Sequence, residues 1–314
     1  MTNSAFETTD WRVSDRVQRK SLVKRAAYGV LRPFLSARAA RYLSPSFRQQ
    51  VRPDAVYFTR GTPEEWRRQW GARHVALSEA TILVQGAGTG WEVVAWAGMK
   101  PCRIIATDLY PFDDSWEEIA AECRDRFGVT AEFREAALED HAFLASGSID
   151  LCASAAVFEH CRDLDAVLAE SSRLLRPGGS LYAAYGPLWY APGGDHFSGR
   201  DGLASAYNHI ALENDAYEEY VAANLLPRED FQSGGRYVEL DLFSRLGTRS
   251  YLAAFEKAGL SRDGLVIELS PDALSFRRQY SDRWQALLAR QSGQCDSDDL
   301  MIKANFVRLL KPDG

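Results

Sequence analysis

Metal-binding and disulfide motifs are absent from this 314-residue sequence. Its five cysteines are odd in number and scattered, and none forms a Cys-x-x-Cys pair, which excludes a zinc ribbon or a redox dithiol. The five histidines are equally dispersed, without His-Glu-x-x-His or a similar ligand spacing. The sequence therefore predicts reduced thiols and no metal site.

Long hydrophobic runs are also missing. No stretch approaches the length of about 18 apolar residues that a membrane span needs, and the N-terminus has no apolar segment typical of a signal peptide. The apolar content of 46% and charged content of 25% are those of an ordinary globular protein. We therefore expect a cytoplasmic protein without a membrane partner.

Charge is distributed unevenly along the chain. Its net charge is −6, yet residues 11–60 contain twelve Lys or Arg against two Asp. Such a segment can bind nucleic acid or an anionic membrane, or it can be a solvated helical face. The run lacks the clustering of a nucleic-acid arm, so we favour the helical face and expect no nucleic-acid partner. A homodimer stays open.

Apolar periodicity predicts an α/β fold. Short apolar runs alternate with helical patterns, which is typical of a parallel sheet with helices on both faces. We expect core strands at 81–85, 103–107, 131–134, 149–154, 180–185, 265–269 and 300–309. Helices are expected at 91–97, 115–127, 164–174, 248–258 and 282–290.

Two further regions flank this pattern. Residues 1–80 are predicted to be a helical N-terminal extension, interrupted at Pro33 and Pro45, with one helix beginning at Pro63 behind the cap Thr62. Residues 186–245 are rich in glycine and aromatic side chains, which indicates a cap inserted into the core. The core would then comprise residues 81–185 and 246–314.

A glycine-rich loop follows the first core strand. Gly86, Gly88 and Gly90 stand at alternate positions, where a strand turns tightly into a helix. The dinucleotide fingerprint would need a glycine at Trp91, and a phosphate-binding P-loop would need Gly-Lys-Ser/Thr, so both are disfavoured. Asp108 ends the second strand, where its carboxylate can accept hydrogen bonds from a ribose.

The motifs together resemble the class I S-adenosylmethionine-dependent methyltransferases, of the type that acts on small molecules. The glycine loop, Asp108, the segment from Ser148 to His160 and the segment from Arg173 to Gly179 occur in the order of that family. The resemblance covers about residues 80–185 and the closing elements of the chain. It implies a Rossmann-like seven-stranded sheet that binds S-adenosyl-L-methionine.

The resemblance also implies which residues bind the cofactor. The glycines would lie along its methionine and ribose, Asp108 would hold the ribose, and Leu109 would pack on the adenine. The full set is Gly86, Gly88, Gly90, Asp108, Leu109, Leu138, Glu139, Ser154 and Ala155. One departure is Val84, where the family usually has an acidic residue.

The acceptor is expected to be a small molecule enclosed by the cap. His160, Tyr190, Asp195 and His196 are the candidate catalytic residues, because His and Asp can orient or deprotonate an acceptor and aromatic faces favour a cation. An oxygen, a nitrogen or the sulfur of a methionine-like compound stays open as the methylated atom. The alternatives are a non-catalytic cofactor-binding protein and, less favoured, a nicotinamide-dependent oxidoreductase.

Overall fold

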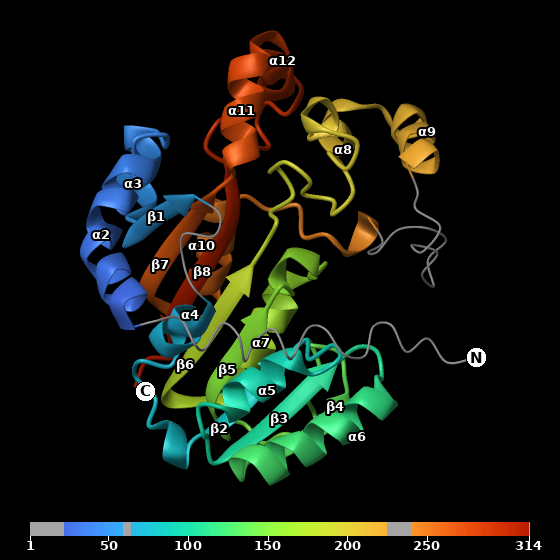
Figure 1. Cartoon of the computed structure of the whole chain (residues 1–314). Helices are drawn as coiled ribbons and strands as arrows, with labels where there is room; N and C mark the ends of the chain where they lie inside the picture. The colour runs from blue at the N-terminus through green and yellow to red at the C-terminus, as the bar shows by residue number, and fades with distance from the viewer. Residues whose placement is uncertain (1–21, 59–63, 225–239, 314) are drawn as a thin grey trace.

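The computed structural model describes residues 22–58, 64–224 and 240–313, and its centre is a sheet of eight strands (Figure 1). The strands follow the order β1-β7-β8-β6-β5-β2-β3-β4. All neighbouring pairs are parallel except those of β8, which runs antiparallel to β6 and β7. The strands are β1 (Ala55–Phe58), β2 (Thr81–Gln85), β3 (Arg103–Asp108), β4 (Thr130–Glu135), β5 (Ile149–Ala155), β6 (Leu175–Tyr185), β7 (Ser261–Leu269) and β8 (Ile302–Leu310).

This sheet confirms the predicted α/β class and adds one strand to the seven expected. Strand β1 lies within the region predicted to be entirely helical, and it pairs in parallel with β7 in the register Ala55 to Val266. Its apolar run of four residues is too short for periodicity to separate a strand from a helix. Pairing with β7 makes this segment a strand, because the pairing gives hydrogen-bond partners to backbone groups of β1.

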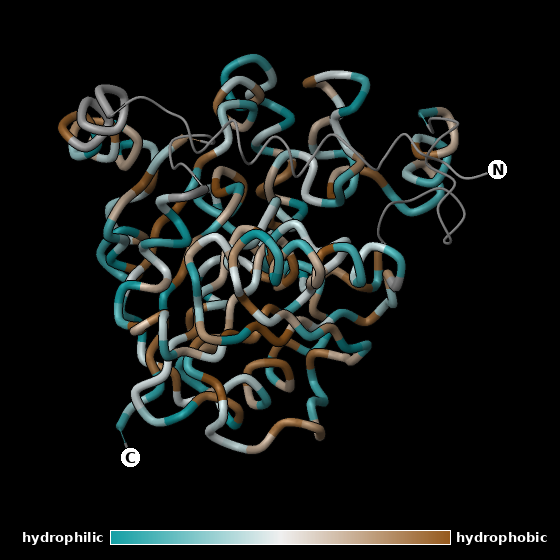
Figure 2. Tube along the Cα trace, turned by 60° about the horizontal axis from the view of Figure 1, so that its bottom comes forward, coloured by the Kyte–Doolittle hydropathy of each residue, from teal (hydrophilic) through white to brown (hydrophobic). Residues whose placement is uncertain are grey.

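Helices cover both faces of the sheet because side chains alternate along each strand. Ile82 and Val84 of β2 pack in one core cluster, together with Val93 of α5, whereas Leu83 packs in the other, together with Val167 of α7. The helices are α2 (Leu22–Ala40), α3 (Pro45–Val51), α4 (Glu64–Gly71), α5 (Trp91–Ala97), α6 (Asp113–Glu122), α7 (Leu164–Leu174) and α10 (Thr248–Lys257). In Figure 2 many of the apolar, brown segments lie in the middle of the molecule, whereas hydrophilic, teal segments are frequent at its outer turns.

Four more helices lie beyond the end of the sheet toward which β6 points (Figure 1). They are α8 (Asn208–Ala211), α9 (Asn214–Asn224), α11 (Pro271–Gln279) and α12 (Ser281–Arg290). The first two belong to the predicted cap insertion. Helix α11 was not predicted, although Ser270 caps it by accepting a hydrogen bond from the backbone of Ala273 at 3.3 Å.

Some element boundaries differ from the sequence prediction. Helix α2 continues through Pro33, since a proline removes only one helical hydrogen bond and the packing of α2 on β1 remains. Strand β6 begins at Leu175 and not at residue 180 as predicted, so the segment from Arg176 to Gly179 is its irregular first part. The cap Thr62, the helix start at Pro63 and residues 225–239 of the insertion lie outside the described residues.

Membrane-spanning helices were not expected. Within the described ranges, every helix is too short or too polar to cross a bilayer.

Candidate active site

The glycine loop turns the chain from the end of β2 into α5. Gly86, Gly88 and Gly90 all have left-handed φ angles, of 72°, 50° and 95°. A Cβ atom on Gly86 would lie 2.2 Å from Cγ2 of Val157, so this glycine allows close packing of the loop on the chain after β5. A Cβ atom on Gly88 would meet no atom within 4 Å. The loop is therefore packed at Gly86 and open at Gly88.

Asp108, at the end of β3, holds the open part of this loop. Its Oδ2 accepts a hydrogen bond from the backbone N–H of Gly88 at 2.8 Å, and its Oδ1 accepts one from Tyr110 at 3.1 Å. Each carboxylate oxygen has a further lone pair that a ribose hydroxyl can use. The predicted cofactor residues Gly88 and Asp108 are thus in direct contact.

Trp116 is a third support of the loop, and no sequence motif indicated its role. The side chain of Trp116 in α6 donates a hydrogen bond from Nε1 to the carbonyl of Gly88 at 2.8 Å. Its ring stacks on Phe133 of β4 with centroids 5.3 Å apart. Both peptide groups of Gly88 are therefore held by side chains from neighbouring elements.

The remaining residues on this side lie around Asp108. Leu109 is half exposed, and the carbonyl of Asp108 accepts a hydrogen bond from Ala136, which draws the segment after β4 alongside. In that segment Leu138 packs on the core whereas Glu139 is exposed. The arrangement brings the predicted adenine-side residues to one edge of the sheet.

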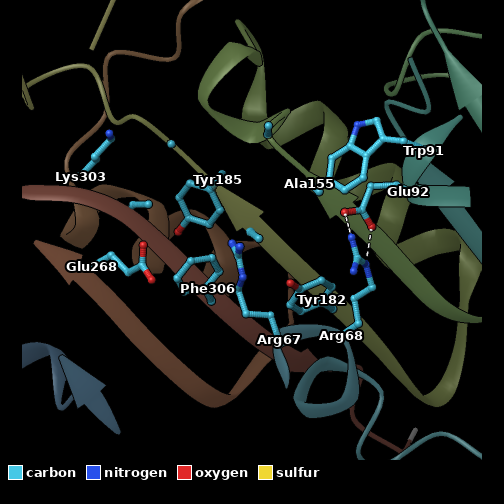
Figure 3. A pocket seen from close by; sticks show the side chains of 14 residues that line it. Arg67, Arg68, Trp91, Glu92, Ala155, Tyr182, Tyr185, Glu268, Lys303 and Phe306 are labelled. Atoms are coloured by element: carbon cyan, nitrogen blue, oxygen red, sulfur yellow. Dashed lines mark hydrogen bonds and ion pairs between the residues drawn. The ribbon is translucent and has the colours of Figure 1, made fainter. Parts of the chain in front are cut away.

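A cavity of about 220 Å³ opens beside the end of β5 (Figure 3). Ala155 and Ala156 form part of its wall, and Ala156 has a left-handed φ of 57°. Ser154 precedes them, and its buried hydroxyl has no hydrogen-bond partner among the described residues. The cavity reaches from Trp91, which follows the glycine loop, to Gly186 at the end of β6.

Charged and aromatic side chains line this cavity together. Arg68 of α4 donates two hydrogen bonds to the carboxylate of Glu92, at 2.9 and 2.6 Å, and the dashed lines in Figure 3 mark this pair. The guanidinium of Arg67 lies 4.6 Å from the ring centroid of Phe306. Other lining side chains are Tyr182, Tyr185, Glu268 and Lys303. The cavity can thus enclose a small molecule that carries polar or charged groups.

On the cap side of the sheet, the fold brings His160 and His196 together. His160 belongs to the short helical turn Phe158–His160 after β5, and the ring centroids of the two histidines are 4.8 Å apart. Phe243, from the end of the insertion, packs against both rings at 4.8 and 5.5 Å. Glu159 lies beside them and is almost fully buried.

Burial controls protonation in this cluster. It lowers the pKa of His160 to about 3, with a smaller contribution from His196, and it lowers the pKa of His196 to about 4. Burial also raises the pKa of the Glu159 carboxyl to about 7. Both imidazoles are therefore neutral near pH 7 and can act as acceptors or ligands.

Asp195 and Tyr190 point elsewhere. The buried carboxylate of Asp195 accepts hydrogen bonds from the backbone of Phe197, from the backbone and hydroxyl of Ser198, and from Tyr217. Although burial alone would raise it, the pKa of Asp195 is held below its usual range by His209 and these hydrogen bonds. Tyr190 is buried, which raises its pKa to about 12. The structure thus joins His160 to His196 and directs Asp195 into the interior of the cap.

Known proteins similar to this chain agree with the motifs of its core. Residues 83–183 match a family model described as a methyltransferase domain. The match includes the glycine loop, Asp108 and the chain from β5 into β6. The predicted resemblance to methyltransferases is thereby confirmed for residues 83–183.

A curated relative covers a similar part of the sequence. An arsenite methyltransferase from Aquipseudomonas alcaligenes is 46% identical over 138 residues, which amount to 38% of this chain and 37% of the relative. The chain therefore spans well under half the length of this relative.

Solved structures with a similar chain course include two bacterial proteins. The geranyl diphosphate C-methyltransferase of Streptomyces coelicolor A3(2) is 15% identical with a TM-score of 0.46, over 79% of this chain and 81% of that one. The YcgJ protein of Bacillus subtilis is 17% identical with a TM-score of 0.43, over 79% and 98% of the two chains.

Proposed function

We propose that this chain transfers the methyl group of S-adenosylmethionine to a small-molecule acceptor. The observation that carries the proposal is the geometry of the glycine loop at Gly88. Its left-handed backbone is held by Asp108 and Trp116, and the space that a Cβ atom would occupy is open. This open loop lies within the segment that matches the methyltransferase domain, at the carboxyl ends of β2 and β3, where parallel sheets bind ligands.

The chain has a different residue or pair of residues for each part of the cofactor. Asp108 would accept the ribose hydroxyls with the lone pairs that its two backbone donors leave, and the half-exposed Leu109 would cover the adenine. Leu138 and Glu139 would border the adenine through their main chain. Ser154, with its buried hydroxyl, and Ala155 would meet the amino-acid end. When bound, S-adenosylmethionine supplies a methyl group activated by a sulfonium.

The acceptor would occupy the cavity beside β5. The cavity of about 220 Å³ suits a small molecule, and its lining extends from Trp91, directly after the glycine loop, to Gly186 at the end of β6. The protein's part is to hold the acceptor in line with the methyl group and to exclude water. Asp195 and Tyr190 would shape the cap that encloses this space.

The arsenite relative offers one candidate acceptor, which the fold does not favour. Arsenite binds thiolates, a soft ligand type. Across the described residues, no three thiols gather within ligand distance. An oxygen, a nitrogen or a methionine-like sulfur is therefore a better candidate for the methylated atom.

Calorimetry tests the proposal directly. We expect the protein to bind S-adenosylmethionine and its demethylated product, and Asp108→Ala to weaken both by about 1 to 3 kcal/mol, the scale of hydrogen bonds to a charged group. A screen of acceptors with methyl-labelled cofactor would then identify the product. Binding of NADH without binding of either sulfur compound would contradict the proposal, and cofactor binding without any labelled product would favour a non-catalytic protein.

A further inference from the structure

Three potential metal ligands meet between the core and the cap. Glu159, His160 and His196 each offer one ligand atom, and these atoms all lie within 4.8 Å of one another. The first two follow β5, and the third belongs to the insertion after β6. No sequence motif connects the three residues, because His196 is far from Glu159 and His160 in the sequence. Only the fold brings them together.

Glu159 is fixed with one oxygen left over. Its side chain is buried, and Oε1 accepts a hydrogen bond from the backbone N–H of Gly186 at 2.9 Å. Its backbone carbonyl accepts one from Ser244 at 2.9 Å, which ties the residue to the end of the insertion. Oε2 has no hydrogen-bond partner among the described residues. A buried carboxylate oxygen without a partner is costly, and a cation would satisfy it.

The histidines are presented to this oxygen by rigid surroundings. Nδ1 of His160 is buried and has no hydrogen-bond partner within the described ranges. His196 has a left-handed φ of 62°, and its backbone is held by Gly193 at 2.9 Å and Arg200 at 3.1 Å. Phe243 packs against both rings. Strained, fixed backbone at a non-glycine residue is typical of functional sites.

We propose that Glu159, His160 and His196 bind one divalent transition-metal ion, which leaves coordination positions open for an oxygen atom of the acceptor. Two imidazoles and one carboxylate with open positions form a recognised donor set for such ions. Ligand atoms at about 2.0 to 2.2 Å from one ion lie about 3 to 4 Å from each other. Small side-chain rotations would bring the three atoms to that spacing.

The location connects this site to methyl transfer, and this step rests on the proposed function. Gly186, which donates to Glu159, also lines the cavity that begins beside the glycine loop. A hydroxyl bound to the ion would lose its proton to water more easily. Its oxygen would then form a bond to the methyl carbon as the carbon–sulfur bond breaks, and the electron pair would stay on sulfur. The products are a methyl ether and the demethylated cofactor.

Cobalt binding tests the site without any need for turnover. Protein freed of affinity tags would be titrated with Co²⁺ and followed by calorimetry and visible absorption. We expect one ion per chain, with affinity reduced at least about tenfold, or about 1.4 kcal/mol, in His196→Ala and Glu159→Gln. Glu159→Gln keeps the shape of the side chain, and circular dichroism would confirm that each variant is folded. His74→Ala, which removes a histidine that lies outside the cluster and pairs with Asp263, should bind like the wild type.

Equal Co²⁺ affinity in the wild type and both cluster variants would overturn the metal site. The role of the open positions has a separate test with acetohydroxamate, a small bidentate oxygen ligand, which should shift the absorption of bound Co²⁺ in the wild type. An unchanged spectrum would overturn the acceptor part. Calorimetry with S-adenosylmethionine on the same samples separates the two proposals, since Co²⁺ binding without cofactor binding would contradict only the proposed function.

Discussion

In one half of the site, Gly86 and Gly88 follow strand β2 and Asp108 ends the neighbouring strand β3. In the other half, His160 of the core lies beside His196 of the cap. We call the first set, with Trp116, the cofactor half, and Glu159, His160 and His196 the acceptor half. The cofactor half is tied by hydrogen bonds to backbone groups of a single loop. The acceptor half combines side chains from segments that are distant in sequence, and Phe243 from a third segment packs against its two histidines.

This difference explains how one fold can keep a ligand and vary a substrate. Parallel strands β2 and β3 fix the cofactor half through their register, with Gln85 beside Thr107. The acceptor half depends on an insertion, which can change in length and composition without disturbing the sheet. The proposed methyl transfer therefore rests on the cofactor half, and the choice of acceptor is expected to depend on the insertion.

The largest effect is expected from Gly88→Ala. The new methyl group would occupy the open space where we place the cofactor, so we expect S-adenosylmethionine affinity to fall about a hundredfold, or about 2.7 kcal/mol. Gly128→Ala is the matched control, because Gly128 also has a left-handed φ and open space around a Cβ atom, but it ends the π-helical turn Cys123–Phe127 that follows α6. Both variants should lose about 1 to 2 kcal/mol of stability from backbone strain.

Calorimetry and thermal unfolding on the pair would decide the matter. If Gly88→Ala bound the cofactor as tightly as Gly128→Ala, the open loop would not be the binding surface. The division of the site into a cofactor half and an acceptor half would then be wrong.

The cofactor half could be predicted because its signals are local. Three glycines between an apolar run and a helix indicate one turn, and Asp108 stands at the next strand end, so strand order alone brings them together. Trp116 escaped prediction since nothing in a helical pattern shows that an indole N–H reaches a carbonyl in another element. Strand β1 escaped since its four residues become a strand only through pairing with β7.

The acceptor half could be predicted only as separate residues. His160 and His196 were candidates from their place after strand ends, but their contact depends on the left-handed turn at His196 and on Phe243 packing over both rings. Glu159 was not singled out as a catalytic residue, and its significance comes from burial and from its hydrogen bond to Gly186. The roles of Asp195 and Tyr190 in the reaction stay predictions.

A smaller effect is expected from Trp116→Phe. The substitution removes the donor to the Gly88 carbonyl but keeps an aromatic ring against Phe133, so cofactor affinity should fall by about 1 kcal/mol, the net value of one hydrogen bond. Phe133→Leu is the counterpart, because it weakens the stacking and leaves the hydrogen bond. Calorimetry that found the larger loss in Phe133→Leu would show that packing, and not the hydrogen bond, holds the loop.

The smallest effect is expected on the loss of folding stability at acid pH, to which the surroundings of the two halves contribute through different histidines. Next to the cofactor half, the buried His141 forms a hydrogen bond through Nε2 with Thr107, which precedes Asp108, at 3.0 Å. Burial lowers the pKa of His141 more than Glu170 raises it. His141 therefore takes up a proton less readily in the folded state than in the unfolded chain, where the pKa of its imidazole is near 6.5. The resulting stability is present above that value and is lost as the pH falls below it.

We expect His141→Gln to reduce this acid sensitivity between pH 7 and pH 5.5, because glutamine takes up no proton in that range. Urea unfolding at several pH values would measure it, with His74→Gln as the control for an exposed histidine. The buried His160, His196 and His209 keep the remaining slope in all variants, because burial lowers the pKa of each. Parallel curves for wild type and His141→Gln would show that His141 does not contribute to the acid sensitivity.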